Sequence, residues 1–237
     1  MALRFAAGRL VDADGNGAEW PDLAVIGDPI VHSLSPRLHA AALRARGLEH
    51  RYEAIAVPGS ELTSFVVAAR EHAMIGLSVT VPHKEAVVGL CDTISDEARE
   101  IGAVNTLVAR RGTWVGHNTD ARGLALALQR WRGRTLGRSL AHAVVLGAGG
   151  AARAAVACVR GLGARRITVA ARRPERATWT KDAGAELVTL DRAPVRSCSL
   201  LVQCTPLGLR PESDPSPVSL DGLDPAPVDA YLYTPPY

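Results

Sequence analysis

Residues 141–163, "AHAVVLGAGGAARAAVACVRGLG", predict a strand, a tight turn and a helix at the start of the second half of this chain. An apolar run leads into a loop of small residues and then into an alanine-rich helical pattern, with Gly147, Gly149 and Ala152 at the spacing G-x-G-x-x-G/A. Small residues allow a tight turn and let a pyrophosphate approach the backbone N–H groups at the positive end of a helix. Glycines also occur in ordinary turns, but a strand before the loop and a helix after it favour a dinucleotide-binding Rossmann fold.

The residues after the next predicted strand, "RITVAA" (166–171), indicate which dinucleotide binds. In this fold the end of that strand contacts the adenosine ribose, and NAD-binding forms usually carry an acidic residue there. This chain has Arg172 and Arg173 instead, with Arg176 one turn on. Guanidinium groups can bind a 2′-phosphate in bidentate fashion and stack on adenine. We therefore expect NADP in preference to NAD, the alternative being an exposed basic loop in an arginine-rich protein.

The first half alternates short apolar runs with helical patterns. The runs "LAVIG" (23–27), "RYEAIAV" (51–57) and "IGLSVTV" (75–81) are typical of strands, and helical patterns over residues 35–47 and 60–73 separate them. The order βαβαβ predicts an open, mainly parallel sheet with right-handed crossovers. The predicted fold class is therefore α/β, an open α/β domain followed by a Rossmann-type domain.

Helix signals refine this organisation. Ser35 is predicted as the N-cap of the first helix, with Pro36 at the first helical position and Gly47 at the end. Two short strands are expected around Gly112, followed by a helix that starts near Thr119. The predicted divisions are an N-terminal domain over residues 1–122, a connecting helix and linker over residues 123–140, and a Rossmann-like domain over residues 141–237.

Composition excludes several classes of protein. The chain has 237 residues, is 47% hydrophobic and carries a net charge of +3, which fits one or two globular domains. Its arginines do not form long blocks, so nucleic acid is not an expected partner. No apolar run approaches the length of a membrane span and no signal-peptide core is present, so we expect a cytoplasmic protein with no membrane partner. The cysteines lack CxxC spacing and the histidines form no cluster, so no metal site is predicted.

Lysine is rare in this chain, and its placement is informative. Of the 27 basic residues only Lys84 and Lys181 are lysines, so arginine supplies most of the surface charge. Lys84 follows the third predicted strand in "GLSVTVPHKEAVV" (76–88), and open α/β sheets bind ligands beyond the carboxyl ends of their strands. A lysine can give up a proton, whereas arginine effectively never does so in proteins. We interpret Lys84 as a candidate for proton transfer.

Several stretches together resemble the shikimate dehydrogenase family, and they occur in the order of that family. They are "SLSPRLHAAAL" (33–43), "SVTVPHKEAV" (78–87), "GAVNTLV" (102–108), "GHNTDARG" (116–123), "GAGGAARA" (147–154) and "QCTPLGL" (203–209). The motifs "VTxPxK" and "NTD" are far more specific than the glycine loop. The resemblance implies a substrate domain, a Rossmann domain and an active site in the cleft between them. It also implies NADPH-dependent reduction of 3-dehydroshikimate to shikimate in aromatic amino-acid biosynthesis.

The resemblance assigns roles to individual residues. Reduction of a ring ketone places negative charge on its oxygen, where Lys84 would deliver a proton and Asp120 would pair with it. Asp120 has the alternative role of capping the helix that follows. The implied substrate contacts are Ser33, Ser35, Thr80, Asn105 and Tyr233. The implied cofactor contacts are Gly147, Ala148, Gly149, Gly150, Ala151, Arg172, Arg173 and Thr205.

Some of these residues have structural alternatives. Ser35 is also a good N-cap, and Asn105 can serve as a turn former. Asn118 is expected either near the substrate ring or only in shaping its loop. His83 and His117 flank the proposed catalytic pair but receive no role, because a histidine beside a site is more often incidental.

Three departures from the family pattern limit what can be carried over. Ser78 stands where the family commonly has asparagine in "NVT", and its single donor predicts a substrate contact that is weaker or replaced by water. Gln203 stands where asparagine is usual in "NATPLG", near the expected nicotinamide. The family continues beyond "DAYLYTPPY" into helices that pack on the substrate domain, whereas this sequence ends at Tyr237. Two interpretations follow: the sequence is a truncated form of a longer chain, or the protein is a reduced relative with impaired turnover. An apolar seam left uncovered would favour association, and a homodimer is one form that such association can take.

Alternative functions remain open at this point. A quinate/shikimate or aminoshikimate-type dehydrogenase would share the motifs. A catalytically impaired relative that binds nucleotide or metabolite is compatible with the short C-terminus. A hydrolase is not expected, because no nucleophile elbow or metal set appears in the sequence.

Overall fold

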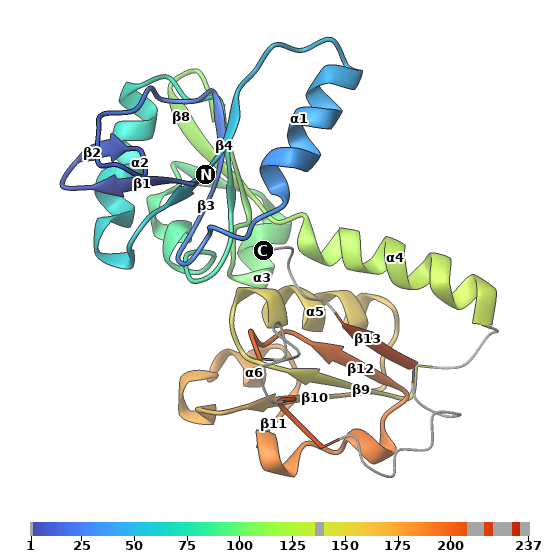
Figure 1. Ribbon diagram of the computed structural model, residues 1–237. Helices are drawn as coiled ribbons and strands as arrows, with labels where there is room; N and C mark the ends of the chain where they lie inside the picture. The colour runs from blue at the N-terminus through green and yellow to red at the C-terminus, as the bar shows by residue number, and fades with distance from the viewer. Residues whose placement is uncertain (1, 136–139, 208–215, 220–228, 233–237) are drawn as a thin grey trace. The chain divides into compact units, whose positions relative to one another are not determined.

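The computed structural model describes residues 2–135, 140–207, 216–219 and 229–232, with side chains described outside 131–135 and 229–232. The chain forms two compact units, one containing the residues up to Asn118 and the other starting at Thr119. Each unit has its own β-sheet (Figure 1). Helix α4 (Asp120–Thr135) belongs by its contacts to the second unit. It begins at Asp120, whereas the connecting helix and linker are predicted over residues 123–140.

The first unit contains an eight-stranded sheet in the order β2-β1-β4-β3-β5-β7-β8-β6. Its strands are β1 (Leu3–Ala6), β2 (Arg9–Val11), β3 (Leu23–Gly27), β4 (Tyr52–Ala56), β5 (Gly76–Val79), β6 (Thr93–Ile94), β7 (Thr106–Arg110) and β8 (Thr113–His117). Strands β1, β4, β3 and β5 run parallel to one another, as the βαβαβ pattern predicts for the last three. Strand β7 pairs antiparallel with both β5 and β8. The sheet is therefore parallel at its centre and mixed towards its edges.

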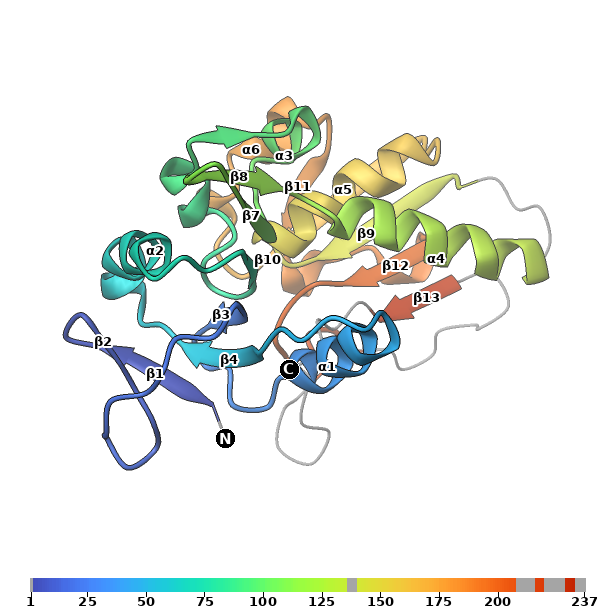
Figure 2. The same ribbon diagram turned by 90° about the horizontal axis from the view of Figure 1, so that it is seen from above.

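Helices cover both faces of this sheet. They are α1 (Ser35–Ala45), α2 (Leu62–Glu71) and α3 (Asp96–Ile101), with the 3-10 turns η1 (Gly59–Glu61) and η2 (Ala86–Leu90). Helices α1 and α2 lie on opposite faces (Figures 1 and 2). Because successive strand residues point to opposite faces, Ile26 and Ile55 pack with the buried residues of α2, whereas Val25 and Ala54 pack with Leu43 of α1.

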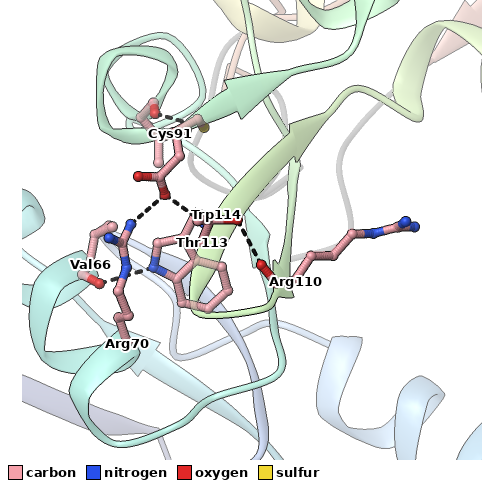
Figure 3. Close-up of polar contacts among 8 residues, drawn as sticks. Val66, Arg70, Cys91, Arg110, Thr113 and Trp114 are labelled. Atoms are coloured by element: carbon pink, nitrogen blue, oxygen red, sulfur yellow. Dashed lines mark hydrogen bonds and ion pairs between the residues drawn. The ribbon is translucent and has the colours of Figure 1, made fainter.

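Polar contacts fasten β8 to α2. Trp114 is 1% exposed, and its indole N–H donates a 3.2 Å hydrogen bond to the carbonyl of Val66 (Figure 3). The carboxylate of Asp92 accepts the backbone N–H of Trp114 at 2.7 Å and the guanidinium of Arg70 at 2.6 Å. The largest side chain of the core is thus held at both its ring and its backbone.

The predicted N-cap of α1 is wrong. The helix begins at Ser35 itself, after Leu34, which provides no side-chain cap. Because Leu34 already has helical backbone angles (φ −84°, ψ −6°), the helix starts one residue before the position that Pro36 suggests. The hydroxyl of Ser33, not that of Ser35, accepts a backbone N–H of the first turn, at 3.2 Å from the nitrogen of Ser35.

The second unit contains an all-parallel sheet in the order β11-β10-β9-β12-β13. Its strands are β9 (His142–Leu146), β10 (Arg166–Ala171), β11 (Glu186–Thr189), β12 (Leu200–Gln203) and β13 (Asp229–Leu232). With α4 it contains α5 (Gly150–Gly161), α6 (Trp179–Asp182), η3 (Pro174–Arg176), η4 (Leu190–Arg192) and η5 (Val195–Ser197). In chain order the strands follow 3-2-1-4-5, which is the Rossmann arrangement.

Helix α5 is built from small residues, and it packs against β9 and β10 on one face of this sheet (Figure 1). The other face is covered by the segment that contains η4 and η5, where Val195 and Cys198 pack with Val144 and Leu146. The first strand of the unit is therefore buried on both faces. Its continuous apolar run is the pattern that such a strand requires.

Candidate active site

The carboxyl ends of β3, β4 and β5 form one edge of the first sheet. Backbone hydrogen bonds connect the segments that leave this edge: the N–H of Asp28 donates to Val81 at 3.0 Å, and that of Val57 donates to Gly27 at 3.1 Å. The predicted residues Thr80 and Lys84 lie in the segment that follows β5. This is the edge at which open α/β sheets bind ligands.

Lys84 is buried here, with an exposed fraction of only 6%. Its carbonyl accepts the N–H of Val104 at 2.7 Å, which ties the lysine segment to the chain entering β7. Lysine is almost never buried to this extent unless its charge has a partner. A burial of this kind, at the ligand-binding edge, agrees with a functional lysine.

His83 fixes the turn that carries Lys84, a role that sequence reasoning missed. It is 1% exposed, and its Nε2 lies 2.7 Å from the carbonyl oxygen of Val57. A carbonyl only accepts, so Nε2 must carry the hydrogen. Burial lowers the pKa of His83, although the bond to Val57 and the charge of Asp28 act in the opposite direction. The only sequence feature that points to this role of His83 is its place directly after proline in "VPHK". Its partner, the carbonyl of Val57, lies 26 residues earlier and cannot be read from the local sequence.

Thr80 and Asn105 lie at the same edge. The N–H of Val79 donates to the carbonyl of Asn105 at 2.7 Å, which places Asn105 beside the end of β5. The hydroxyl of Thr106 donates to Oδ1 of Asn105 at 2.9 Å and so orients this amide. Both predicted residues are half-buried.

Asn118 contributes to the shape of its loop, and its contact with the substrate ring stays a prediction. It is 2% exposed, and its Nδ2 donates to the carbonyl of Ala103 at 3.0 Å.

Ser33 and Ser35 are half-buried at the start of α1, where the Ser33 hydroxyl accepts the N–H of Ser35. Ser33 therefore has a structural function that the sequence had suggested for Ser35.

Ser78 has a protein partner. The hydroxyl of Tyr52 donates to the hydroxyl of Ser78 at 2.8 Å. Burial raises the pKa of Tyr52 to about 12, against the opposing effect of this bond, so the phenol keeps its proton. The imidazole of His39 stacks on the Tyr52 ring at 4.0 Å between centroids. Tyr52 also lines an open pocket of about 540 Å³ beside α1, together with Pro36, Arg37, Ala40 and Arg44.

Asp120 is half-buried at the start of α4. It belongs to the second unit, whereas Lys84 belongs to the first, and the pairing of the two side chains stays a prediction. Tyr233, the predicted substrate contact near the end of the chain, lies outside the described residues.

The glycine loop between β9 and α5 fits a pyrophosphate. Gly147 has φ +107°, and a Cβ there would lie 3.0 Å from the carbonyl carbon and oxygen of Cys204. Only glycine suits this position. Gly149 is the N-cap of α5 and has no side chain to accept a helix N–H. Together with Ala148, Gly150 and Ala151, the loop offers backbone donors at a helix N-terminus, which is a favourable site for an anionic group.

Arg172 and Arg173 are exposed directly after β10, and Arg176 is exposed in η3. The end of β10 neighbours the end of β9 in the parallel register of the sheet, so the basic residues and the glycine loop share one edge. Their charge suits the 2′-phosphate of NADP.

Gln203 and Thr205 close the loop after β12. The Gln203 amide accepts the N–H of Thr205 at 2.8 Å and donates to the carbonyl of Leu207 at 3.0 Å. The Thr205 hydroxyl accepts the N–H of Leu207 at 3.2 Å. The amide at position 203 therefore holds the turn. The cofactor contact expected of Thr205 stays a prediction.

The described residues contain no group of three or more His, Cys, Asp or Glu side chains placed to hold a metal ion. All four cysteines lie in the described part of the chain, and none of them forms a disulfide. Among the helices that the structure describes, none has the length and apolar character of a membrane-spanning segment.

Comparison with known proteins defines the family. Residues 25–107 match the family model for the shikimate dehydrogenase substrate binding domain. The shikimate dehydrogenase (NADP(+)) of Symbiobacterium thermophilum is 39% identical over 219 residues, covering 86% of this chain and 72% of that protein. The chain belongs to the shikimate dehydrogenase family. A second family member, from Methanopyrus kandleri, is 38% identical over 237 residues, covering 92% of this chain and 79% of that protein.

Solved structures of shikimate dehydrogenases agree with this assignment. Shikimate 5-dehydrogenase from Thermus thermophilus, in complex with NADP(H) and shikimate, has a TM-score of 0.76 at 39% identity, covering 89% of this chain and 77% of that chain. The enzyme from Aquifex aeolicus has a TM-score of 0.73 at 33% identity, covering 82% and 72%. The predicted family and the α/β fold with a Rossmann-type domain are confirmed.

Proposed function

We propose that this chain is an NADP-dependent shikimate dehydrogenase, an oxidoreductase that reversibly reduces 3-dehydroshikimate to shikimate in the biosynthesis of chorismate and the aromatic amino acids. One observation carries the proposal. A lysine only 6% exposed stands at the ligand-binding edge of the substrate-domain sheet, in a chain that builds its surface charge from arginine.

The proposed chemistry depends on a charge and a proton at one oxygen atom. Bound NADPH supplies hydride to the carbon of the substrate's ring ketone. The ammonium group of Lys84 stabilises the negative charge that develops on the ketone oxygen and donates a proton to it. Asp120 pairs with Lys84 at the resulting hydroxyl. In the oxidation direction the neutral amine of Lys84 takes the proton back from the hydroxyl.

The remaining polar residues orient the substrate. Thr80 and Asn105 offer a hydroxyl and an amide at the same edge of the sheet as Lys84, and an amide presents a donor and an acceptor together, which suits a polyol. We assign the substrate carboxylate to Ser33 and Ser35 at the start of α1. Tyr233 is proposed as a further wall of the site.

Two features support NADP as the cofactor. The residues of the glycine loop place backbone N–H groups where a pyrophosphate binds, and Arg172 and Arg173 present guanidinium groups for a 2′-phosphate. NAD lacks that phosphate, so we expect tighter binding of NADP. Thr205 is proposed at the nicotinamide end of the cofactor site.

The proposal is tested by incubating the protein with shikimate and NADP⁺ and following the absorbance of NADPH. We expect turnover that is faster with NADP⁺ than with NAD⁺. Quinate and an aminoshikimate are assayed in parallel, because a higher kcat/KM on either would reassign the substrate. Absence of turnover at every substrate and enzyme concentration tried would contradict the proposal.

A homodimer and a cytoplasmic location complete the proposal. Helix α1 has no buried residue, and Leu38 is 62% exposed beside an exposed Leu34. Apolar side chains grouped in this way favour association. Sedimentation of the purified chain measures its oligomeric state, and fractionation of cells that express it measures the location.

A further inference from the structure

Trp179 contacts the glycine loop from a distant segment. It is the first residue of α6, it is half-buried, and its indole N–H donates a 3.2 Å hydrogen bond to the carbonyl of Ala148, 31 residues earlier. The G-x-G-x-x-G/A pattern includes no tryptophan and gives no reason for one at this position.

The contact fixes the direction of one peptide group. The peptide bond between Ala148 and Gly149 is planar and trans, so its carbonyl oxygen and its N–H point to opposite sides. With the oxygen turned towards Trp179, the N–H of Gly149 is turned away from it. Gly149 is the second glycine of the fingerprint, where the backbone approaches the pyrophosphate of a bound dinucleotide.

A second contact holds the indole in place. The guanidinium carbon of Arg153 lies 4.9 Å from the centroid of the Trp179 ring, a distance at which a cation is attracted to the ring face. The backbone N–H of Arg153 donates to the carbonyl of Gly149 at 3.0 Å, so Arg153 belongs to the first turn of α5. Trp179 thus connects α6 to the loop and, through Arg153, to the helix that follows the loop.

We propose that Trp179 is a positioning residue for the cofactor: its indole N–H holds the Ala148–Gly149 peptide with the Gly149 N–H directed at the pyrophosphate of NADP. The inference rests on the proposed function for the identity of the cofactor. It goes beyond that function in assigning a role to a side chain outside the fingerprint. Tryptophan suits the role because its ring nitrogen only donates, so it can pair with a carbonyl and with no backbone N–H.

The test is the substitution Trp179→Phe, which keeps an aromatic ring for Arg153 to stack on and removes the indole N–H together with part of the ring area. Binding is measured by calorimetry with two ligands. NADP⁺ contains the pyrophosphate, whereas adenosine 2′-monophosphate contains only the groups expected to contact Arg172 and Arg173. The matched control is Trp20→Phe, the same change in the first unit, where Trp20 stacks on Phe65 and His72.

We expect Trp179→Phe to weaken NADP⁺ binding about three- to tenfold, the size of one lost hydrogen bond, and to leave binding of adenosine 2′-monophosphate unchanged. The control should bind both ligands as the wild type does. Equal weakening of both ligands would indicate a general structural role and overturn the proposal, as would unchanged binding of NADP⁺. A wild type that binds no NADP⁺ would overturn the proposed function itself, which distinguishes the two failures.

Discussion

The hydroxyl of Tyr52 donates a 2.8 Å hydrogen bond to the hydroxyl of Ser78. The two residues lie on β4 and β5, which flank β3, so the tyrosine side chain crosses the strand between them. Ser78 stands where the family resemblance leads one to expect an asparagine. The tyrosine hydroxyl donates to the oxygen of this shorter side chain, so the hydroxyl hydrogen of Ser78 is not used in the bond between them.

We predict that Tyr52→Phe lowers the free energy of unfolding by about 0.5–1.5 kcal/mol, because the substitution deletes one hydrogen bond and retains the packing of the ring. Urea denaturation measures this change. In a double-mutant cycle with Ser78→Ala, the second substitution should cost less once the first is present. Strictly additive effects would show that the bond contributes nothing to stability.

Asp92 provides a comparison between two kinds of contact. Its carboxylate accepts the backbone N–H of Trp114, and it also pairs with Arg70, whose side chain is 40% exposed. We predict that Asp92→Ala costs about 1–3 kcal/mol because it leaves the Trp114 N–H without its acceptor. Arg70→Met should cost less than about 1 kcal/mol, because exposed ion pairs are weak. A larger loss for Arg70→Met than for Asp92→Ala would contradict this ranking.

Stability should fall on the acid side of neutrality. Burial is the main cause of a lowered pKa in His83 and also in His142, which is 6% exposed with its Nε2 2.8 Å from the Thr168 hydroxyl. An unfolded histidine binds a proton at about pH 6.5, so below that pH the unfolded state holds more protons than the folded state. Stability is therefore full above about pH 6.5 and is lost as the pH falls towards the folded pKa values.

The matching measurement is the free energy of unfolding over a series of pH values. The variant His83→Gln/His142→Gln should be less stable than the wild type at neutral pH. Its stability should decline less steeply as the pH is lowered, because two proton-binding groups of the unfolded state have been removed. Parallel profiles for the two proteins would show that these histidines do not cause the decline.

Two glycines of the second unit, one in the glycine loop and one at the end of α5, allow a matched pair of substitutions. Gly147→Ala introduces a Cβ at φ +107° and 3.0 Å from backbone atoms of Cys204, so we expect a loss of about 1–3 kcal/mol in stability and weaker NADP⁺ binding. Gly161→Ala changes the last residue of α5, where a Cβ meets nothing within 4 Å, and should be neutral or stabilising by up to about 1 kcal/mol. Equal stability of the two variants in urea denaturation would refute the argument.

The strands, helices and loops that can be predicted from the sequence are those with a regular local pattern of residues. Periodicity identifies the parallel strands β3, β4 and β5 with the helices between them, and the spacing of small residues identifies the loop between β9 and α5. It does not identify α3, which has six residues, or β6, which has two, because such lengths show no period. The hairpin of β1 and β2 was also missed, although Phe5 and Leu10 flank a turn at Gly8 with φ +77°.

The candidate site was predictable in its residue types and less so in its contacts. Lys84, Thr80 and Asn105 could be named because they lie in short motifs at a strand end. The partners of Ser78 and Ala148 lie 26 and 31 residues away and are brought close only by the tertiary fold. The contact of the Ser33 hydroxyl with the N–H of Ser35 has a local cause, the helical backbone of Leu34, which leucine as a residue type does not reveal.

The substitution Lys84→Arg tests whether Lys84 transfers a proton, because the charge is kept while the ability to give up a proton is lost. The matched control is Lys181→Arg, which changes the other lysine of the chain at an exposed position on α6. The measurement is kcat for shikimate oxidation by NADP⁺, with NADP⁺ affinity determined separately. We predict that Lys84→Arg lowers kcat by about 10²–10⁴-fold with the affinity retained, while Lys181→Arg matches the wild type. A Lys84→Arg enzyme with the kcat of the wild type would show that Lys84 does not transfer the proton.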